Sequence, residues 1–191
     1  MWGIPSELPS DMEDEEEIEA RDESTNIGRR MFERMEDIEL VLRFFAYRQI
    51  NSFSGGLNKI NALLDRFLIE GNKFSERILL VYRQMFEATI SLLSELMGND
   101  VFCRMDRAGK ASSRPTKIVY DPLMYVASRY QKGKDRQRPM SGKDILVNEL
   151  SNMYKLHGDL FAGRRTNTAD MQQRNKHVMN AFQSALTKLT K

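Results

Sequence analysis

The chain has 191 residues, of which 41% are hydrophobic and 29% are charged, a length and composition suited to one domain with a buried core. It has one cysteine and two histidines, which excludes a disulfide framework and a cysteine-rich zinc site. The sequence contains no apolar run long enough to span a membrane. We therefore expect a soluble, cytoplasmic protein that binds no cofactor.

The net charge of +2 is unevenly distributed along the chain. Residues 1–25 hold ten acidic side chains and one basic side chain, a net charge of −9, so the remainder carries +11. A block of like charge cannot bury enough apolar surface to become ordered, which predicts a disordered acidic leader over residues 1–26 and one helical domain over 27–191. The leader is either a solvated tail, which we favour, or it has a function, as a mask that folds onto a basic surface or as a tether for a partner.

Helical spacing of apolar residues predicts a mainly α protein, a single bundle of about six helices. Gly71 and Gly98 end two of these helices, and Ser141 and Thr168 are the expected N-caps of two others. Pro122 fits only the first turn of its helix. No alternating strand pattern is convincing, although the basic loops between helices leave room for one. The expected helices span residues 29–50, 57–69, 73–97, 119–130, 141–154 and 168–189.

The helix predicted at residues 73–97 continues the apolar stripe over about seven turns, and with the two helices before it resembles antiparallel neighbours in a helical bundle. The residues of this stripe are Phe74, Ile78, Val81, Met85, Leu92 and Leu96.

Two loops rich in basic residues lie between the predicted helices. Residues 101–143 hold eleven basic and three acidic side chains, a net charge of +8. Such a surface either contacts the phosphates of a nucleic acid in a salt-dependent way or keeps a helical bundle solvated. The nucleic-acid-binding candidates are Arg104, Arg107, Lys110, Arg114, Lys117, Lys132, Lys134, Arg136 and Arg138.

The sequence offers no catalytic constellation. A Gly-rich phosphate loop is missing, and neither His157 nor His177 has a second ligand at helical spacing. Four carboxylates between residues 33 and 39 could hold a divalent cation, but arginines are interleaved with them, so we favour ion pairs. We expect no metal site, and it stays open whether the chain takes part in catalysis within a complex.

The run RMEDIELVLRFFA at residues 34–46 resembles the opening signature of a known family's helical C-terminal half. The family is that of the ParB-like proteins related to the GmrSD type IV restriction endonucleases. Weaker similarity extends to about residue 186. The family's Asp-Gly-Gln-Gln-Arg and His-Asn-His nuclease signatures are missing from this sequence, so no catalytic residue carries over. The signature helix contributes Arg34, Asp37, Glu39 and Arg43 as candidate functional residues.

The resemblance implies a non-catalytic accessory component of a restriction-like, DNA-associated phage-defence system. Its expected partners are DNA and a ParB-like nuclease chain, with which it would complete a split enzyme. Two alternatives stay open. The carboxylates of the signature helix contribute to a nuclease or NTPase site in a complex, or the bundle is a structural interaction module without a nucleic-acid role.

Overall fold

A computed structural model describes residues 29–30, 32–49, 60–98, 101–105, 111–130, 139, 141–162 and 167–189. The predicted leader, residues 1–26, lies outside these ranges. The chain divides into two units, Met1–Val41 and Leu42–Lys191.

The described residues form six complete α-helices and one pair of strands, so the prediction of a mainly α protein is confirmed. A 3-10 helix, η2 (Gly158–Phe161), follows the fifth of them. No helix in the described ranges combines the length and apolar character needed to cross a membrane. The elements are α2 (Glu36–Arg48), α3 (Ile60–Gly71), α4 (Glu76–Met97), β1 (Cys103–Met105), β2 (Ala111–Pro115), α5 (Lys117–Ala127), α7 (Lys143–His157) and α8 (Thr168–Lys188).

The first predicted helix is interrupted. Residues 32–33 are helical, but a turn at Arg34 and Met35 separates them from α2, and Met35 has a φ of 54°. The Met35 carbonyl accepts a hydrogen bond from the amide of Glu39 (3.0 Å), within the first turn of α2. The prediction of one continuous helix is therefore wrong. Three acidic side chains occupy the first turn of α2, where the positive end of the helix dipole favours negative charge.

The C-terminal half of α2 packs against α3 and α4 through aromatic rings. Phe45 stacks on Tyr82 of α4, with ring centroids 4.8 Å apart, and on Phe67 of α3, at 6.4 Å. Phe44 meets Phe86 of α4 edge-on at 5.4 Å. Each such pair contributes about 0.5–1.5 kcal/mol beyond the burial of its rings. This half of α2 is thus a central element of the second unit.

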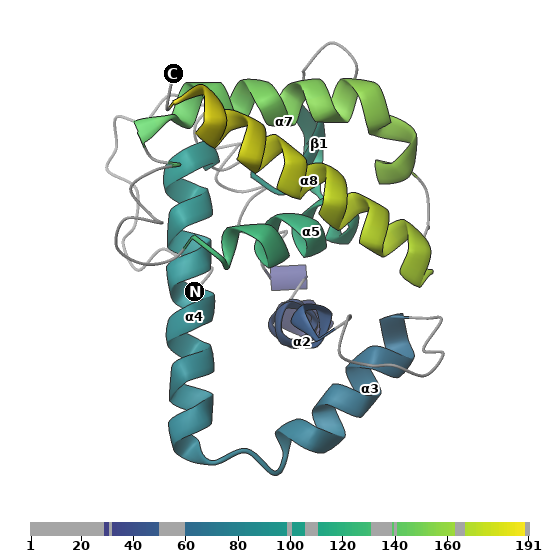
Figure 1. Ribbon diagram of the computed structural model, residues 1–191. Coiled ribbons are helices and arrows are strands. Elements are labelled where there is room, and N and C mark those ends of the chain that lie inside the picture. The colour runs from purple at the N-terminus through teal and green to yellow at the C-terminus, as the bar shows by residue number, and fades with distance from the viewer. Residues whose placement is uncertain are drawn as a thin grey trace, which may run out of the picture. The chain divides into compact units, whose positions relative to one another are not determined.

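Helix α8 packs along α7 and against α5 (Figure 1). Val178 and Phe182 of α8, Leu150 of α7 and Leu123 of α5 are fully buried. Burying each apolar side chain of this size stabilises the fold by about 1.5–3 kcal/mol. The last three α-helices therefore share one core, which α4 joins through its contacts with α5 and α7.

Two predicted N-caps are wrong by one residue. The N-cap of α7 is Gly142 instead of Ser141, and glycine has no side chain with which to cap the first turn. The N-cap of α8 is Asn167 instead of Thr168, and the Asn167 Oδ1 accepts the amide of Asp170 (2.8 Å). Asparagine and threonine both cap helices, so the sequence alone does not separate two adjacent candidates.

The predicted helix ends are confirmed, but the position of a proline is not. Gly71 is the last residue of α3, and Gly98, with a φ of 68°, follows the last residue of α4. Pro122 is the sixth residue of α5, inside the helix and outside the predicted first turn. Because proline has no amide proton, α5 lacks one main-chain hydrogen bond at this position.

Candidate functional site

The two short strands form an antiparallel hairpin within the first basic loop. Cys103 pairs with Pro115 and Met105 with Ala111, and the register is irregular between the two pairs. The amide of Arg104 on β1 donates a hydrogen bond to the hydroxyl of Ser112 on β2 (3.1 Å). With three and five residues, these strands are too short for an alternating pattern to stand out in the sequence.

The base of the hairpin is fixed to the core. Val101, Phe102 and Cys103 are buried, and the ring of Phe102 packs edge-on against Tyr120 of α5, with centroids 5.0 Å apart. The Phe102 carbonyl accepts the amide of Thr116 (2.9 Å), the N-cap residue of α5. The hairpin and α5 therefore hold each other in place.

Three of the nine predicted nucleic-acid-binding residues lie on this hairpin or at its exit. Arg104 is on β1 with an exposed side chain, Arg114 is on β2, and Lys117 is the first residue of α5. The other six lie outside the described residues, although two of them belong to the five positions that connect β1 to β2. These six are Arg107, Lys110, Lys132, Lys134, Arg136 and Arg138.

The signature residues Arg34, Asp37 and Glu39 lie at the start of α2. Arg34 is in the turn before the helix, and its Nη1 is 3.9 Å from Oε1 of Glu36. Asp37 and Glu39 are in the first turn of α2. Across the described part of the chain, no three His, Cys, Asp or Glu side chains are grouped so that they could hold a metal ion.

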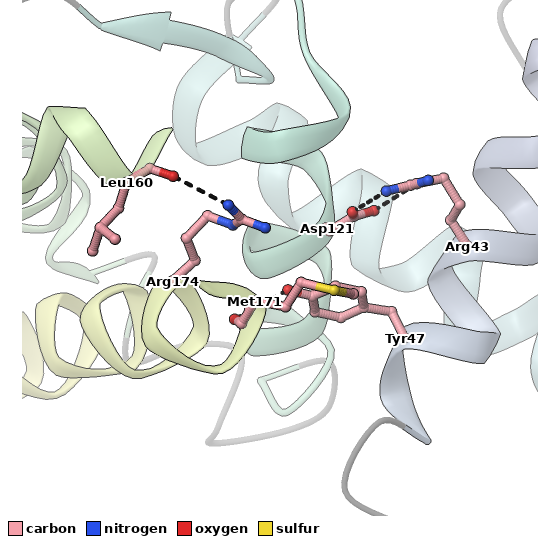
Figure 2. A network of polar contacts seen from close by, with 6 residues as sticks. All are labelled: Arg43, Tyr47, Asp121, Leu160, Met171 and Arg174. Atoms are coloured by element: carbon pink, nitrogen blue, oxygen red, sulfur yellow. Dashed lines mark hydrogen bonds and ion pairs between the residues drawn. The ribbon is translucent and has the colours of Figure 1, made fainter. Parts of the chain in front are cut away.

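Arg43, the fourth signature residue, is buried in a polar network (Figure 2). Its guanidinium donates two hydrogen bonds to the carboxylate of Asp121 in α5, one from Nε to Oδ1 (3.0 Å) and one from Nη2 to Oδ2. This bidentate geometry offsets much of the cost of removing both charges from water. The sequence spacing points to Glu39 as a partner, whereas Asp121 is 78 positions away in the chain.

Tyr47 and Arg174 extend the network to α8 and η2. The Tyr47 hydroxyl donates to the carbonyl of Met171 (3.2 Å), and Nη1 of Arg174 donates to the carbonyl of Leu160 (3.1 Å). Burial, followed by the negative charge of Asp121, raises the pKa of Tyr47. The hydroxyl therefore stays protonated and remains a donor at neutral pH.

The residues of this network face the interior. Arg43 is 7% exposed, Asp121 4% and Arg174 2%, so a substrate cannot reach their charged groups. We call Arg43, Tyr47, Asp121 and Arg174 the buried clamp, because they fix the C-terminal half of α2 against α5 and α8. The one feature of the sequence that could have indicated this buried clamp is the charged residue Asp121, which lies inside an otherwise apolar stretch of α5.

The two histidines, which are remote from each other in sequence, are neighbours in the structure. The ring centroids of His157, at the end of α7, and His177, in α8, are 3.7 Å apart with 31° between the ring planes. Burial, followed by the charges of His157 and Lys176, lowers the pKa of His177. Periodicity within one helix does not reveal a contact between two helices.

We expect the stability of the protein to fall as the pH is lowered through the ordinary histidine pKa of about 6.5. The pKa of His177 is lowered by folding, so the unfolded chain takes up the proton first. The stabilising contribution is therefore present above that pH and is lost below it. Urea unfolding of wild type and His177→Gln at about pH 7.5 and about pH 5.5 measures the difference.

The variant should lose less stability on acidification than the wild type does. Gln173→Ala, an exposed substitution on the same helix, should keep the full pH dependence. An identical pH dependence in wild type and His177→Gln would contradict this assignment.

The hairpin has a buried base, and the side chain of Arg104 on it is exposed. Helix α5, which follows β2 in the chain, is held in place by the buried clamp through Asp121. The candidate interface is therefore the solvent side of β1, β2 and the start of α5. Comparison of the chain with protein-family models, with curated proteins and with solved structures gives no match.

Proposed function

We propose that the chain is a non-catalytic, DNA-binding accessory module whose hairpin contacts the phosphate backbone. The observation that carries this proposal is the exposed Arg104 on a hairpin with a buried base, followed by Arg114 on β2 and Lys117 at the start of α5. Residues 103–117 contain five basic side chains and one acidic side chain, a net charge of +4. A two-stranded ribbon fits the major groove of B-DNA, and Arg and Lys contacts to phosphate supply most non-specific affinity.

The setting that we propose is a restriction-like defence system in which a ParB-like nuclease chain supplies the catalytic domain. The support is the resemblance of residues 34–46 to that family. Within this run, Arg43 has a structural task in the buried clamp, which fits a module that binds and positions. Co-expression with a ParB-like nuclease chain tests this setting, and failure of the two chains to co-purify would overturn it.

DNA binding is tested by titrating a labelled duplex with the purified chain at a series of salt concentrations. We expect log K to fall linearly with log salt concentration, with a slope of about −0.9 per phosphate contacted. Replacing Arg104, Arg107, Lys110 and Arg114 by alanine should weaken binding by about tenfold or more and flatten the slope by about one unit per lost contact.

A control variant removes the same number of charges elsewhere. Arg83, Lys155, Lys176 and Lys188 are exposed on α4, α7 and α8, and their replacement by alanine should leave most of the affinity and the salt slope intact. Equal losses in the two variants would show that bulk charge is responsible and would contradict the hairpin assignment. No binding by the wild type at low salt would overturn the DNA-binding proposal.

A further inference from the structure

Two arginine side chains, one from α2 and one from the end of α5, converge on the last residues of α5. Arg48 is the last residue of α2, and its Nη1 donates a hydrogen bond to Oγ of Ser128, the C-cap of α5. The Ser128 hydroxyl donates in turn to the carbonyl of Tyr125 (2.7 Å). Arg129 comes directly after Ser128, and its Nη2 donates to the Tyr125 hydroxyl (2.8 Å). We call Arg48 and Arg129 the arginine pair.

Each guanidinium of the arginine pair lies over an aromatic ring four positions earlier in the chain. Arg48 lies over Phe44, 5.7 Å from the ring centroid, and Arg129 lies over Tyr125, at 4.9 Å. Both side chains therefore lean back toward the N-termini of their helices, away from the terminal carbonyls that would offset part of their charge. The rings and the hydrogen bonds hold both cations in place before a ligand arrives.

The arginine pair has no counter-ion among the described residues, where neither guanidinium takes part in an ion pair. The one carboxylate in α5 or in residues 42–48 of α2 is Asp121, and both of its oxygens accept hydrogen bonds from Arg43. Residues 130–138, which follow the pair in the sequence, have a net charge of +3. The charge of the pair is therefore left for a ligand to balance.

The two cations also act on each other. Burial lowers the pKa of Arg48, and the charge of Arg129 adds to this effect, against the opposing influence of Tyr125 and of Tyr82 in α4. Arg48 is half-buried and Arg129 is exposed, so a small solute can reach both of them. An anion bound between the two guanidinia would replace this repulsion by attraction.

The number and directions of the donors indicate which anion fits. A guanidinium has five N–H donors, and each arginine uses one of them in the bonds described above. A carboxylate offers two oxygens in one plane, whereas a phosphate monoester presents three oxygens in three directions and up to two negative charges. Two guanidinia that come from different helices can therefore each donate a pair of hydrogen bonds to one phosphate.

From this geometry and the missing counter-ion, we propose that the arginine pair binds the phosphate group of a small molecule. Because Arg48 is half-buried, a small anion reaches it more easily than the backbone of a duplex does. This inference does not depend on the proposed DNA binding, since the hairpin precedes α5 and the arginine pair lies at the opposite end of that helix.

The test is isothermal titration calorimetry of the full chain with inorganic phosphate and with phenyl phosphate, at fixed ionic strength and up to about 20 mM ligand. We expect saturable binding by the wild type with a Kd of about 1 mM or tighter, and a loss of about tenfold or more in Arg129→Gln. Arg129→Lys keeps the charge but not the two-pronged donor, and it should lose most of the affinity as well. Tighter binding of phenyl phosphate would indicate an organic phosphate as the ligand, and equal binding would indicate free phosphate.

The matched control is Arg77→Gln, which removes an exposed arginine from the first turn of α4 and should bind phosphate as the wild type does. Circular dichroism checks that each variant is folded. No saturable binding by the wild type would overturn the proposal, and so would equal losses in Arg77→Gln and Arg129→Gln or equal binding of acetate. If Arg129→Gln weakened the binding of a duplex and left phosphate binding unchanged, the pair would be a DNA contact and the proposal would be wrong.

Discussion

Asp121→Asn should lower the free energy of unfolding by about 3–5 kcal/mol, because it leaves a charged guanidinium buried without its counter-ion. Asp121 is 4% exposed, and both of its carboxylate oxygens accept hydrogen bonds from Arg43. Asparagine preserves the shape of the side chain and removes its charge, so the effect reports the ion pair more than the packing. Urea denaturation of wild type and variant measures the change, when both curves are fitted with one m-value, the slope of the unfolding free energy against urea concentration.

Two comparisons separate the buried clamp from an ordinary ion pair. In the double variant Arg43→Met/Asp121→Asn, most of the loss should be recovered, since no charge is then buried without a partner. Glu87→Gln breaks an ion pair whose side chains are 68% and 58% exposed, and it should cost less than about 1 kcal/mol. If Asp121→Asn also cost less than about 1 kcal/mol, the conclusion that the Arg43–Asp121 ion pair fixes α2 against α5 would be contradicted.

Phe44→Ala should cost about 3–5 kcal/mol, because it opens a cavity at the junction of α2 and α4. Phe44 is 2% exposed, and its ring touches Phe45 (centroids 4.9 Å apart) and Phe86 (5.4 Å). The guanidinium of Arg48 also lies over this ring, at 5.7 Å from its centroid. Thermal and urea unfolding both measure the loss.

Phe44→Leu is the matched control, since leucine fills most of the space and leaves only a small cavity. It should cost well under half of what alanine does. If Phe44→Ala cost less than about 1 kcal/mol, the ring would not be a core residue in solution.

The helices were predictable because an apolar face repeats every three or four residues, and glycines mark where α3 and α4 end. The features that were missed have no such repeat. The hairpin strands contain too few residues to alternate visibly, and the cap of α8 lies on Asn167 next to an equally suitable threonine. The turn at Met35 gave no signal, because methionine rarely adopts a positive φ.

Periodicity shows which face of a helix is apolar but not whether another element covers it. Ile78 and Val81 belong to the same predicted apolar stripe as Leu92 and Leu96. The structure buries Leu92 and Leu96 completely and leaves Ile78 41% and Val81 49% exposed. This difference in exposure along α4 was therefore invisible in the sequence, as were the partner of Arg43 and the contact between the two histidines, which all depend on how helices meet.

The clamp also bears on how the folded chain opens. Arg43 and Asp121 are separated by 78 positions, so closing the chain between them costs entropy before the ion pair can form. We therefore expect this contact to form after the transition state of folding, so that its strength appears mainly in the unfolding rate. On this expectation, the clamp sets how long the helices stay assembled more than how quickly they come together.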